Sequence, residues 1–290
     1  MSGALVACAV AVVAAIGCAG CGAGSHSQGA TTQQPAASTS QPAAATAPSA
    51  TRRAAEARVA AALARLAARG RPVYCGGRTR PWVAFTFDDG PGVYTRLAVR
   101  ILSAAHVPAT FFLVGQNLAP FDSARRVEQR IGALGDHTWT HPDLAMLGAG
   151  AVEQQIASTK QAIERVSGRR VQLFRPPYGV RDATVDATAR RLGLVDVLWT
   201  VDSADSLGAN YAQIARNVLA GLHPGSIILM HENRGQTIRA LKFHILPRLR
   251  GSHLRLVTLP QLLSQDPPSP RQLALGRLGC GGGPTRRSGA

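Results

Sequence analysis

The chain has 290 residues, of which 46% are hydrophobic, and a formal net charge of +16. This length allows one large domain or two small ones with a real hydrophobic core. The arginines are scattered, without a basic stripe interleaved with aromatic residues. The composition therefore argues against a nucleic-acid-binding protein, and we expect no nucleic-acid partner.

Residues 1–24 are typical of an export signal. An apolar run over 5–16 is followed by small residues and is too short for a standard transmembrane helix. Cys18 and Cys21 both follow small residues, as in the bacterial lipoprotein cleavage box, so a lipidated cysteine and a plain cleaved signal remain alternatives. We expect an exported protein, either secreted or anchored to the outer face of the cytoplasmic membrane or the cell wall. Contact with the membrane would then come only through an N-terminal lipid.

Residues 25–70 are predicted to form a flexible linker. Ala, Ser, Thr, Gln, Pro and Gly make up most of 25–50, which cannot bury enough apolar surface to fold. Apolar residues recur at helical spacing within 51–69, which predicts a short helix on the linker or packed on the domain. At the other end, 267–290 is rich in Pro, Gly, Arg and Ser, and we expect a mostly disordered tail.

Between 71 and 266 the pattern predicts one α/β domain. Repeated strand and helix units with nearly continuous apolar strands argue for a parallel sheet covered by helices, either a barrel or a doubly wound sheet. Apolar runs predict strands at 82–87, 109–114, 171–174, 194–200, 225–230 and 254–258. Periodic stretches predict helices near 94–105, 122–131, 150–167, 181–192, 209–221 and 236–249.

Two adjacent carboxylates, Asp88 and Asp89, follow the first predicted strand. Two charges at the end of a buried strand are costly unless something compensates them. A bound cation would neutralise one carboxylate and lower the pKa of the other. An Asp-Asp-Gly-Pro surface turn is the commoner explanation when these residues are taken alone.

His137 and His141 are four residues apart, a spacing that suits one metal ion. A surface loop explains such a pair more often, but the two upstream carboxylates favour a metal. Two imidazoles and one carboxylate leave coordination positions open for water and substrate, as in a catalytic site.

Polar residues also follow three later predicted strands. Arg175, held before two prolines, could orient a carboxylate through its planar fork, or could simply pack over the rim of the sheet. Asp202 and Asp205 follow the next strand. His231 ends a buried strand and is either a satisfied core histidine or, near a carboxylate and a metal, a general acid.

In order and spacing, these five segments resemble the motifs of the polysaccharide deacetylase family, the NodB-homology domain of carbohydrate esterase family 4. The resemblance runs from about Trp82 to Leu263, so we assign 71–266 to such a domain. We accordingly expect a distorted (β/α) barrel of about seven parallel strands, with the active site at the C-terminal ends of the strands.

The resemblance implies a role for each motif residue. The catalytic residues are the base Asp88, the arginine that orients it, Arg175, the general acid His231, and the carboxylate that tunes it, Asp205. The metal ligands are Asp89, His137 and His141. The substrate-binding residues are Tyr178, whose backbone N–H is the oxyanion donor, Pro177, and Leu229 at the acetyl methyl.

The implied cofactor is one divalent metal, and the ligand set suits Zn²⁺, with Co²⁺ or Ni²⁺ as substitutes. Two features depart from the family. Ser206 stands where an aromatic residue often follows the fourth-motif aspartate, which leaves the roles of Asp202 and Asp205 open. The Gly-His pair usual before the metal histidines is absent.

The function implied is a metal-dependent hydrolase that removes N-acetyl groups from a cell-envelope polysaccharide, with peptidoglycan as the first choice. Within the same enzyme class, the alternatives are a chitin-oligomer deacetylase and a xylan O-acetyl esterase. A non-catalytic glycan-binding module is the alternative from another class. We expect a monomer whose partner is the polysaccharide.

Cys75 and Cys280 are the two cysteines outside the signal segment. Both lie in glycine-rich stretches, one before the first predicted strand and one after the last predicted helix. In an oxidising compartment they are predicted to form a disulfide that joins the two ends of the domain.

Overall fold

Strand β1 (Trp82–Gly90) lies at the centre of a curled parallel sheet. In this computed structural model, which describes residues 49–281, seven strands follow the order β5-β4-β3-β2-β1-β7-β6, and β8 pairs with the start of β1. β5 and β6 stand at opposite ends of this order, so the sheet is curled but not closed. The predicted distorted barrel is therefore confirmed. The other strands are β2 (Ala109–Leu113), β3 (Gly132–Asp136), β4 (Leu173–Phe174), β5 (Val195–Asp196), β6 (Val201–Asp202), β7 (Ile227–His231) and β8 (Arg255–Leu256).

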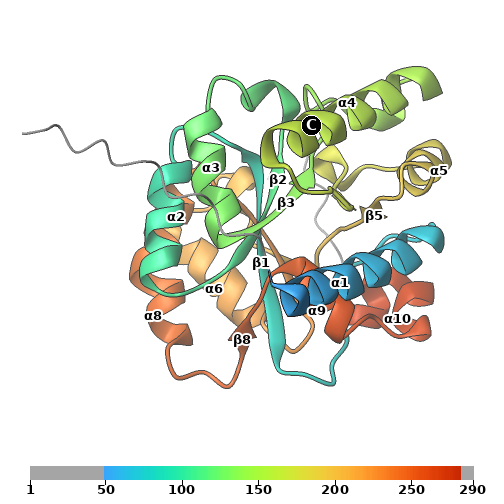
Figure 1. Cartoon of the computed structure of the whole chain (residues 1–290). Helices are drawn as coiled ribbons and strands as arrows, with labels where there is room; N and C mark the ends of the chain where they lie inside the picture. Colours follow the sequence, from blue (N-terminus) through green and yellow to red (C-terminus); the bar gives the residue numbers. More distant parts are fainter. Residues whose placement is uncertain (1–48, 282–290) are drawn as a thin grey trace, which may run out of the picture. The chain divides into compact units, whose positions relative to one another are not determined.

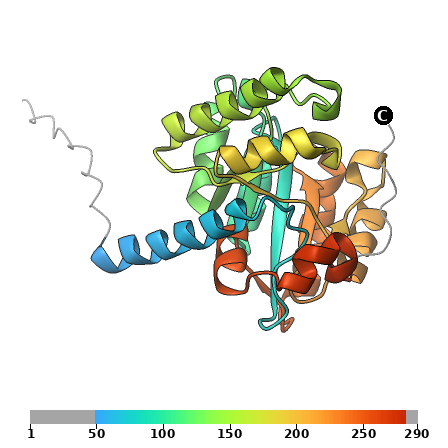
Figure 2. The same ribbon diagram turned by 90° about the vertical axis from the view of Figure 1, so that its right-hand side faces the viewer.

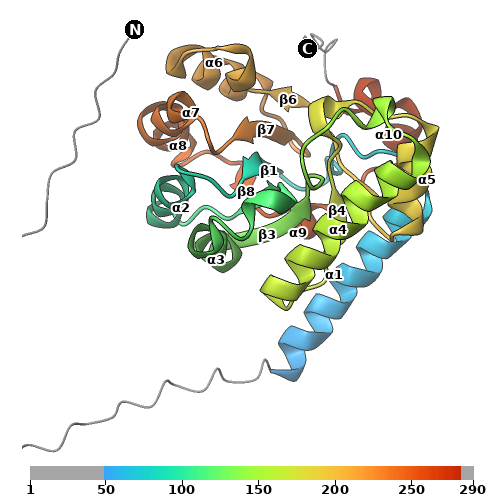
Figure 3. The same ribbon diagram turned by 90° about the horizontal axis from the view of Figure 1, so that it is seen from above.

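Helices surround the curled sheet, as the view from above shows (Figure 3). Each predicted helical stretch corresponds to a helix or a run of helical turns. They are α2 (Thr95–Ala104), α3 (Asp122–Ile131), α4 (Ala149–Ser167), α5 (Ala183–Arg191), α6 (Tyr211–Gly221), and the run of α7 (Gly235–Ala240), η5 (Leu241–Ile245) and α8 (Leu246–Leu249). α9 (Leu259–Gln265) follows β8, and shorter turns are η1 (Gly115–Asn117), η2 (Leu144–Met146), η3 (Pro177–Gly179) and η4 (Asp205–Leu207). Within residues 49–281, no helix is both long and apolar enough to cross a membrane.

Two strands were missed, β3 and the two-residue β6, and the core explains why apolar runs form strands and why β3 was missed. Phe85, Phe87 and Phe111 are fully buried, and the rings of the last two stack 5.6 Å apart. β3 was not predicted because its sequence, Gly-Ala-Leu-Gly-Asp, has no β-branched residue. Its glycines serve close packing instead: a Cβ at Gly135 would lie 2.6 Å from the Phe112 ring.

The helix predicted at 51–69 is present as α1 (Ala50–Ala68), capped by the Ser49 side chain. Its N-terminal turns are exposed and extend away from the other helices (Figure 2). Leu63 and Leu66 are buried in a cluster shared with α9 and β5, where Figure 1 shows α1 and α9 together. The end of α1 is thus part of the domain, which begins before residue 71. The predicted signal segment and the linker up to residue 48 lie outside the described residues.

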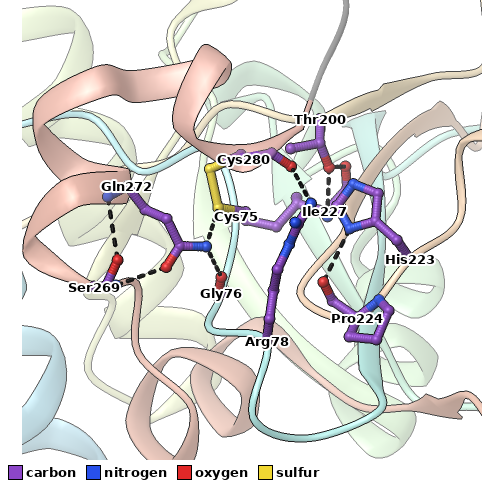
Figure 4. The surroundings of a disulfide bond; sticks show 10 residues. All are labelled: Cys75, Gly76, Arg78, Thr200, His223, Pro224, Ile227, Ser269, Gln272 and Cys280. Atoms are coloured by element: carbon purple, nitrogen blue, oxygen red, sulfur yellow. Dashed lines mark hydrogen bonds between the residues drawn. A yellow bond between two sulfur atoms is a disulfide. The ribbon is translucent and has the colours of Figure 1, made fainter.

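The expectation of a mostly disordered tail is wrong for residues 270–280. These residues form α10 (Pro270–Leu275) and η6 (Gly276–Cys280), and Ser269 and Gln272 make a capping box at the start of α10. The predicted disulfide between Cys75 and Cys280 is confirmed, with the Cα atoms 5.8 Å apart (Figure 4). This covalent link and the cap give the segment an order that its composition did not indicate. Residues 282–290 lie outside the described residues.

Candidate active site

Asp88, at the end of β1, is held by a buried arginine. Its Oδ1 accepts a hydrogen bond from Arg175 Nη1 at 2.7 Å, and both side chains are buried. Arg175 also donates to Thr86 Oγ1 and to the carbonyl of Val197, and it lies over the Phe112 ring. Because the guanidinium is fixed from several directions, Asp88 keeps one position and a compensated negative charge.

Asp89 points to the two predicted metal histidines. Its Oδ1 lies 3.6 Å from His137 Nε2 and 3.3 Å from His141 Nε2, and the three candidate donor atoms lie within 4.8 Å of one another. Asp89 Oδ1 is buried and has no hydrogen-bond partner among the described residues. A buried carboxylate oxygen without a donor is costly, and a cation between these three groups would compensate it.

His137 presents the correct nitrogen to such a cation. Its Nδ1 lies 2.7 Å from the Arg175 carbonyl oxygen, so Nδ1–H donates there and leaves the Nε2 lone pair free. Burial raises the pKa of Asp89, but the neighbouring His231, His137 and His141 outweigh it and lower that pKa overall. Burial, with repulsion from His137, lowers the pKa of His141. Asp89 and His141 thus favour the protonation states that bind a metal, and the three residues fit one divalent ion.

Strained backbone is concentrated at this edge of the sheet. A positive φ is uncommon outside glycine and costs free energy unless the surroundings enforce it. Six non-glycine residues of the described chain have a positive φ, and five of them lie in the motifs, at or just after the strand ends. These five are Asp89 (70°), Thr138 (67°), His141 (61°), Tyr178 (61°) and Ala204 (59°).

Asp205 pairs with His231, which resolves the alternative between the two fourth-motif aspartates. Asp205 Oδ1 lies 2.7 Å from His231 Nδ1, while its Oδ2 accepts from the His231 N–H and from Thr237 Oγ1. Burial opposes the charged imidazole, but Asp205 outweighs it and raises the pKa of His231 to about 9. Asp202 instead accepts from the Ala204 N–H and from the Trp199 indole.

The predicted substrate-binding residues lie beside the histidines. The Tyr178 ring is half exposed and packs edge-on against His141, with the ring centroids 4.7 Å apart. Pro177 and Leu229 are buried, and Leu229 precedes His231 by two residues on β7. The hydrogen bonds that close η3 are donated by the N–H groups of Gly179 and Val180, and none of them uses the Tyr178 N–H.

Three residues near these groups were not predicted. The Thr86 hydroxyl donates a hydrogen bond to the Ile228 carbonyl and accepts one from Arg175 Nη1. Its polar side chain within an apolar run could have indicated such a role from the sequence. Thr237 reaches Asp205 from α7, and Asn233 Nδ2 lies 3.5 Å from Asp89 Oδ2. Neither has a local sequence signal, because each acts across the fold.

Two glutamates, Glu128 on α3 and Glu232 after β7, are fully buried next to Gly90. Their four carboxylate oxygens have no hydrogen-bond partner among the described residues. A Cβ at position 90 would collide with Glu232 Oε1 and lie 3.0 Å from Glu128 Oε1. Burial, with repulsion from Glu232, raises the pKa of Glu128, and burial raises that of Glu232 to about 7. The sequence analysis did not single out either residue.

The family model described as polysaccharide deacetylase matches residues 76–197. A peptidoglycan-N-acetylglucosamine deacetylase of Bacillus cereus is 34% identical over 196 residues, which cover 66% of this chain and 71% of that protein. A chitooligosaccharide deacetylase of Bradyrhizobium is 32% identical over 197 residues, covering 62% and 90%.

Among solved structures, a CE4 family pseudoenzyme from Bacillus anthracis is 27% identical, with a TM-score of 0.60 and coverage of 66% of this chain and 68% of that one. The fold is therefore shared by proteins with and without activity. Taken together, the sequence matches and the common fold place the chain in the polysaccharide deacetylase family.

Proposed function

We propose that this protein is a metal-dependent hydrolase that removes N-acetyl groups from peptidoglycan. Membership of the polysaccharide deacetylase family makes it a hydrolase of an N-acetylated polysaccharide. The observation that carries the metal dependence is one cluster: the donor triad Asp89, His137 and His141 beside the arginine-held Asp88. The choice of peptidoglycan is supported by the relative from Bacillus cereus, a peptidoglycan-N-acetylglucosamine deacetylase. A triad with open positions next to a fixed carboxylate is the arrangement of a hydrolytic metal site.

The chain's own residues supply a base and an acid. A divalent metal at the triad would supply Lewis-acid polarisation of the acetyl carbonyl and acidify the attacking water. Asp88, held in place by Arg175, accepts the water proton. His231, kept protonated by Asp205, donates a proton to the leaving amine nitrogen. The products are acetate and a free amino sugar.

The remaining residues orient the acetyl group. The Tyr178 N–H is not used by the hydrogen bonds that close its turn, so it is available to the developing oxyanion. Loss of one such donor typically costs about 3–4 kcal/mol in activation free energy. Pro177 and Leu229 offer apolar surface to the acetyl methyl.

The alternative function is a non-catalytic one, because a pseudoenzyme has a similar fold. The pairing of Asp205 with His231 argues against it, because a binding module has no use for a histidine held charged. Asp88 likewise keeps the buried arginine partner that a base requires.

Substrate choice is tested by acetate release. We expect release from purified, non-deacetylated peptidoglycan to exceed release from chitin oligomers and from acetylated xylan at equal acetyl content. The chitooligosaccharide deacetylase relative makes chitin oligomers the second candidate. Faster acetate release from chitin oligomers would identify them as the substrate. Release from acetylated xylan alone would show that the enzyme cleaves an ester and not an amide.

We further propose that the protein is exported. The Cys75–Cys280 disulfide supports this, because structural disulfides form and persist in oxidising compartments. Anchoring by an N-terminal lipid is part of the same proposal. Mass analysis of the mature N-terminus from the native cell would distinguish a lipidated cysteine from a freely secreted chain.

A further inference from the structure

A groove of about 410 Å³ lies outside the metal site, between the segment that precedes β1 and the C-terminal turns. One wall is Arg71, Pro72 and Tyr74, and the other is 273–278 of α10 and η6, with Arg181 completing the lining. Three arginines line this groove and no acidic residue does. We call it the terminal groove.

Arg277 in the terminal groove forms no ion pair among the described residues, and burial lowers its pKa, an effect that the charge of Asp202 only partly offsets. Its Nε and Nη1 are buried and have no hydrogen-bond partner among the described residues, while Nη2 reaches the Thr200 carbonyl only at 3.4 Å. Arg181 differs, because it forms ion pairs with Asp186 and Asp196. An unpaired, partly buried guanidinium is costly, and an anionic ligand would offset that cost.

The groove is held open in one shape by the disulfide. Cys75 directly follows Tyr74, and Cys280 ends the turn that carries Arg277. Gly276, with φ +54°, brings that turn so close that a Cβ there would lie 3.3 Å from the Tyr74 ring. Figure 4 shows the disulfide beside Thr200, the residue whose carbonyl Arg277 reaches. Because both walls are covalently joined, a ligand would meet a preorganised surface.

The terminal groove is connected to the candidate active site through Trp199. Trp199 precedes Thr200, and its ring packs against Gly179, the residue after Tyr178. It also lies beside Arg175, the partner of Asp88. Arg181 follows Tyr178 by three residues. A polymer with one sugar at the metal triad could therefore continue along this side of the molecule.

We propose that the terminal groove binds a carboxylate carried by a neighbouring sugar of the glycan substrate. This rests on the proposed function and narrows it to glycan strands whose sugars carry free carboxylates, as peptidoglycan strands do once the stem peptides are removed from their lactyl groups. Arg277 and Arg71, neither of which has an acidic partner within residues 49–281, supply the charged donors. The Tyr74 ring supplies a flat apolar surface for a sugar face.

The test compares two hexasaccharides with the same β-1,4 backbone. One is all N-acetylglucosamine and neutral, and the other carries a lactyl carboxylate on every second sugar. Binding is measured by calorimetry on the full chain with Asp88→Asn, which prevents turnover. We expect the Arg277→Gln variant to lose about tenfold of its preference for the acidic hexasaccharide, the value of one charge-assisted hydrogen bond. Arg277→Lys should keep part of it.

The matched control is Arg271→Gln, an exposed arginine of the same segment that does not line the groove. It removes the same charge and should keep the full preference. Equal weakening of both hexasaccharides by Arg277→Gln, or no change, would overturn the proposal. So would an equal loss in the Arg271→Gln control, since that would reflect only net charge.

A parallel assay of acetate release separates this inference from the proposed function. A chain that releases no acetate but keeps an Arg277-dependent preference supports the groove and contradicts the hydrolase. A chain that releases acetate but shows no Arg277-dependent preference supports the hydrolase and contradicts the groove. Competition by a glycerol phosphate polymer, stronger than by the acidic hexasaccharide, would show that the groove serves a separate polymer and would overturn the proposal.

Discussion

Two regions of this protein, which we call the catalytic edge and the terminal wrap, are stabilised by different interactions. The catalytic edge consists of the motif loops at the C-terminal ends of the strands, where charged groups are buried in compensated pairs such as Asp88 with Arg175. The terminal wrap consists of the end of α1, residues 71–80, α10 and η6. Apolar packing and the Cys75–Cys280 disulfide hold it.

The terminal wrap also has polar contacts, those with Asp266 among them. Asp266 accepts hydrogen bonds from Thr79 Oγ1 and the Arg80 N–H, and its carbonyl receives the Gly77 N–H. Because of this difference, we expect substitutions in the two regions to affect different properties of the protein. Changes to single polar groups at the catalytic edge should alter chemistry, because the charged groups there are held by specific partners, as Asp88 is by Arg175. Changes in the wrap should alter stability, because its contacts are many and mostly apolar.

Metal removal should have the largest effect and should act at the catalytic edge. Dialysis against a chelator is expected to lower acetate release by about 10³-fold or more, because Lewis-acid activation is worth several kcal/mol. Addition of Zn²⁺, and less effectively Co²⁺ or Ni²⁺, should restore it. Full activity in a chain shown by elemental analysis to contain no metal would exclude the metal-dependent mechanism.

Loss of the disulfide should be the largest effect in the wrap. The Cys75→Ser, Cys280→Ser double variant lacks the disulfide, which joins two residues 205 positions apart in the sequence. We expect its free energy of unfolding to fall by about 2–5 kcal/mol, measured by urea denaturation under oxidising conditions. Wild-type protein with a reductant should behave like the variant. An unchanged urea midpoint in both would show that packing alone orders the wrap.

Removal of the carboxylate behind the general acid should have an intermediate effect. Asp205→Asn is expected to lower kcat by about 10²-fold, since correctly placed acid catalysis contributes at least that much. Because Asp205 raises the pKa of His231, its loss should lower that pKa. The alkaline limb of the rate profile should then move to lower pH. A profile with unchanged limbs would mean that another group donates the proton.

The buried glutamate pair should give the smallest effect. Both carboxyls have pKa values above the unfolded value, so their neutral forms favour the folded state. The stability they contribute is complete below about pH 4.5 and is lost as the pH rises through about 7. Glu128→Gln should therefore flatten the decline in unfolding free energy between about pH 4.5 and 7 by about 1–2 kcal/mol.

The control for this prediction is Glu153→Gln on α4, where the glutamate is exposed and pairs with Arg191. It should leave the slope of stability against pH unchanged. A Glu128→Gln chain with the wild-type slope would show that the pair does not titrate in this range.

The two regions also differ in how well sequence predicts them. Asp88 and Asp89 could be placed because charged residues at the end of an apolar strand violate the local pattern and so stand out. His137 and His141 could be placed because their spacing suits one metal ion. The pairing of His231 with Asp205 rather than Asp202 needed the fold, because the two acids are only three residues apart.

In the terminal wrap, the local sequence of α10 and η6 gave little indication of their structure. α10 and η6 were expected to be disordered because their order depends on a link to Cys75, about 200 residues away in sequence. β3 escaped prediction because glycines that fit against Phe112 look like turn residues in isolation. Thr237 and the Glu128–Glu232 pair act across elements, and nothing in their own segments indicates a partner.

The central claim is that two adjacent carboxylates have different tasks, Asp88 as base and Asp89 as metal ligand. The most direct test measures metal content and acetate release in Asp88→Asn and Asp89→Asn side by side. We predict that Asp88→Asn retains wild-type metal content and loses about 10³-fold in kcat, whereas Asp89→Asn loses the metal and the activity together. Equal metal loss in the two variants, or a fully active Asp88→Asn chain, would contradict the account.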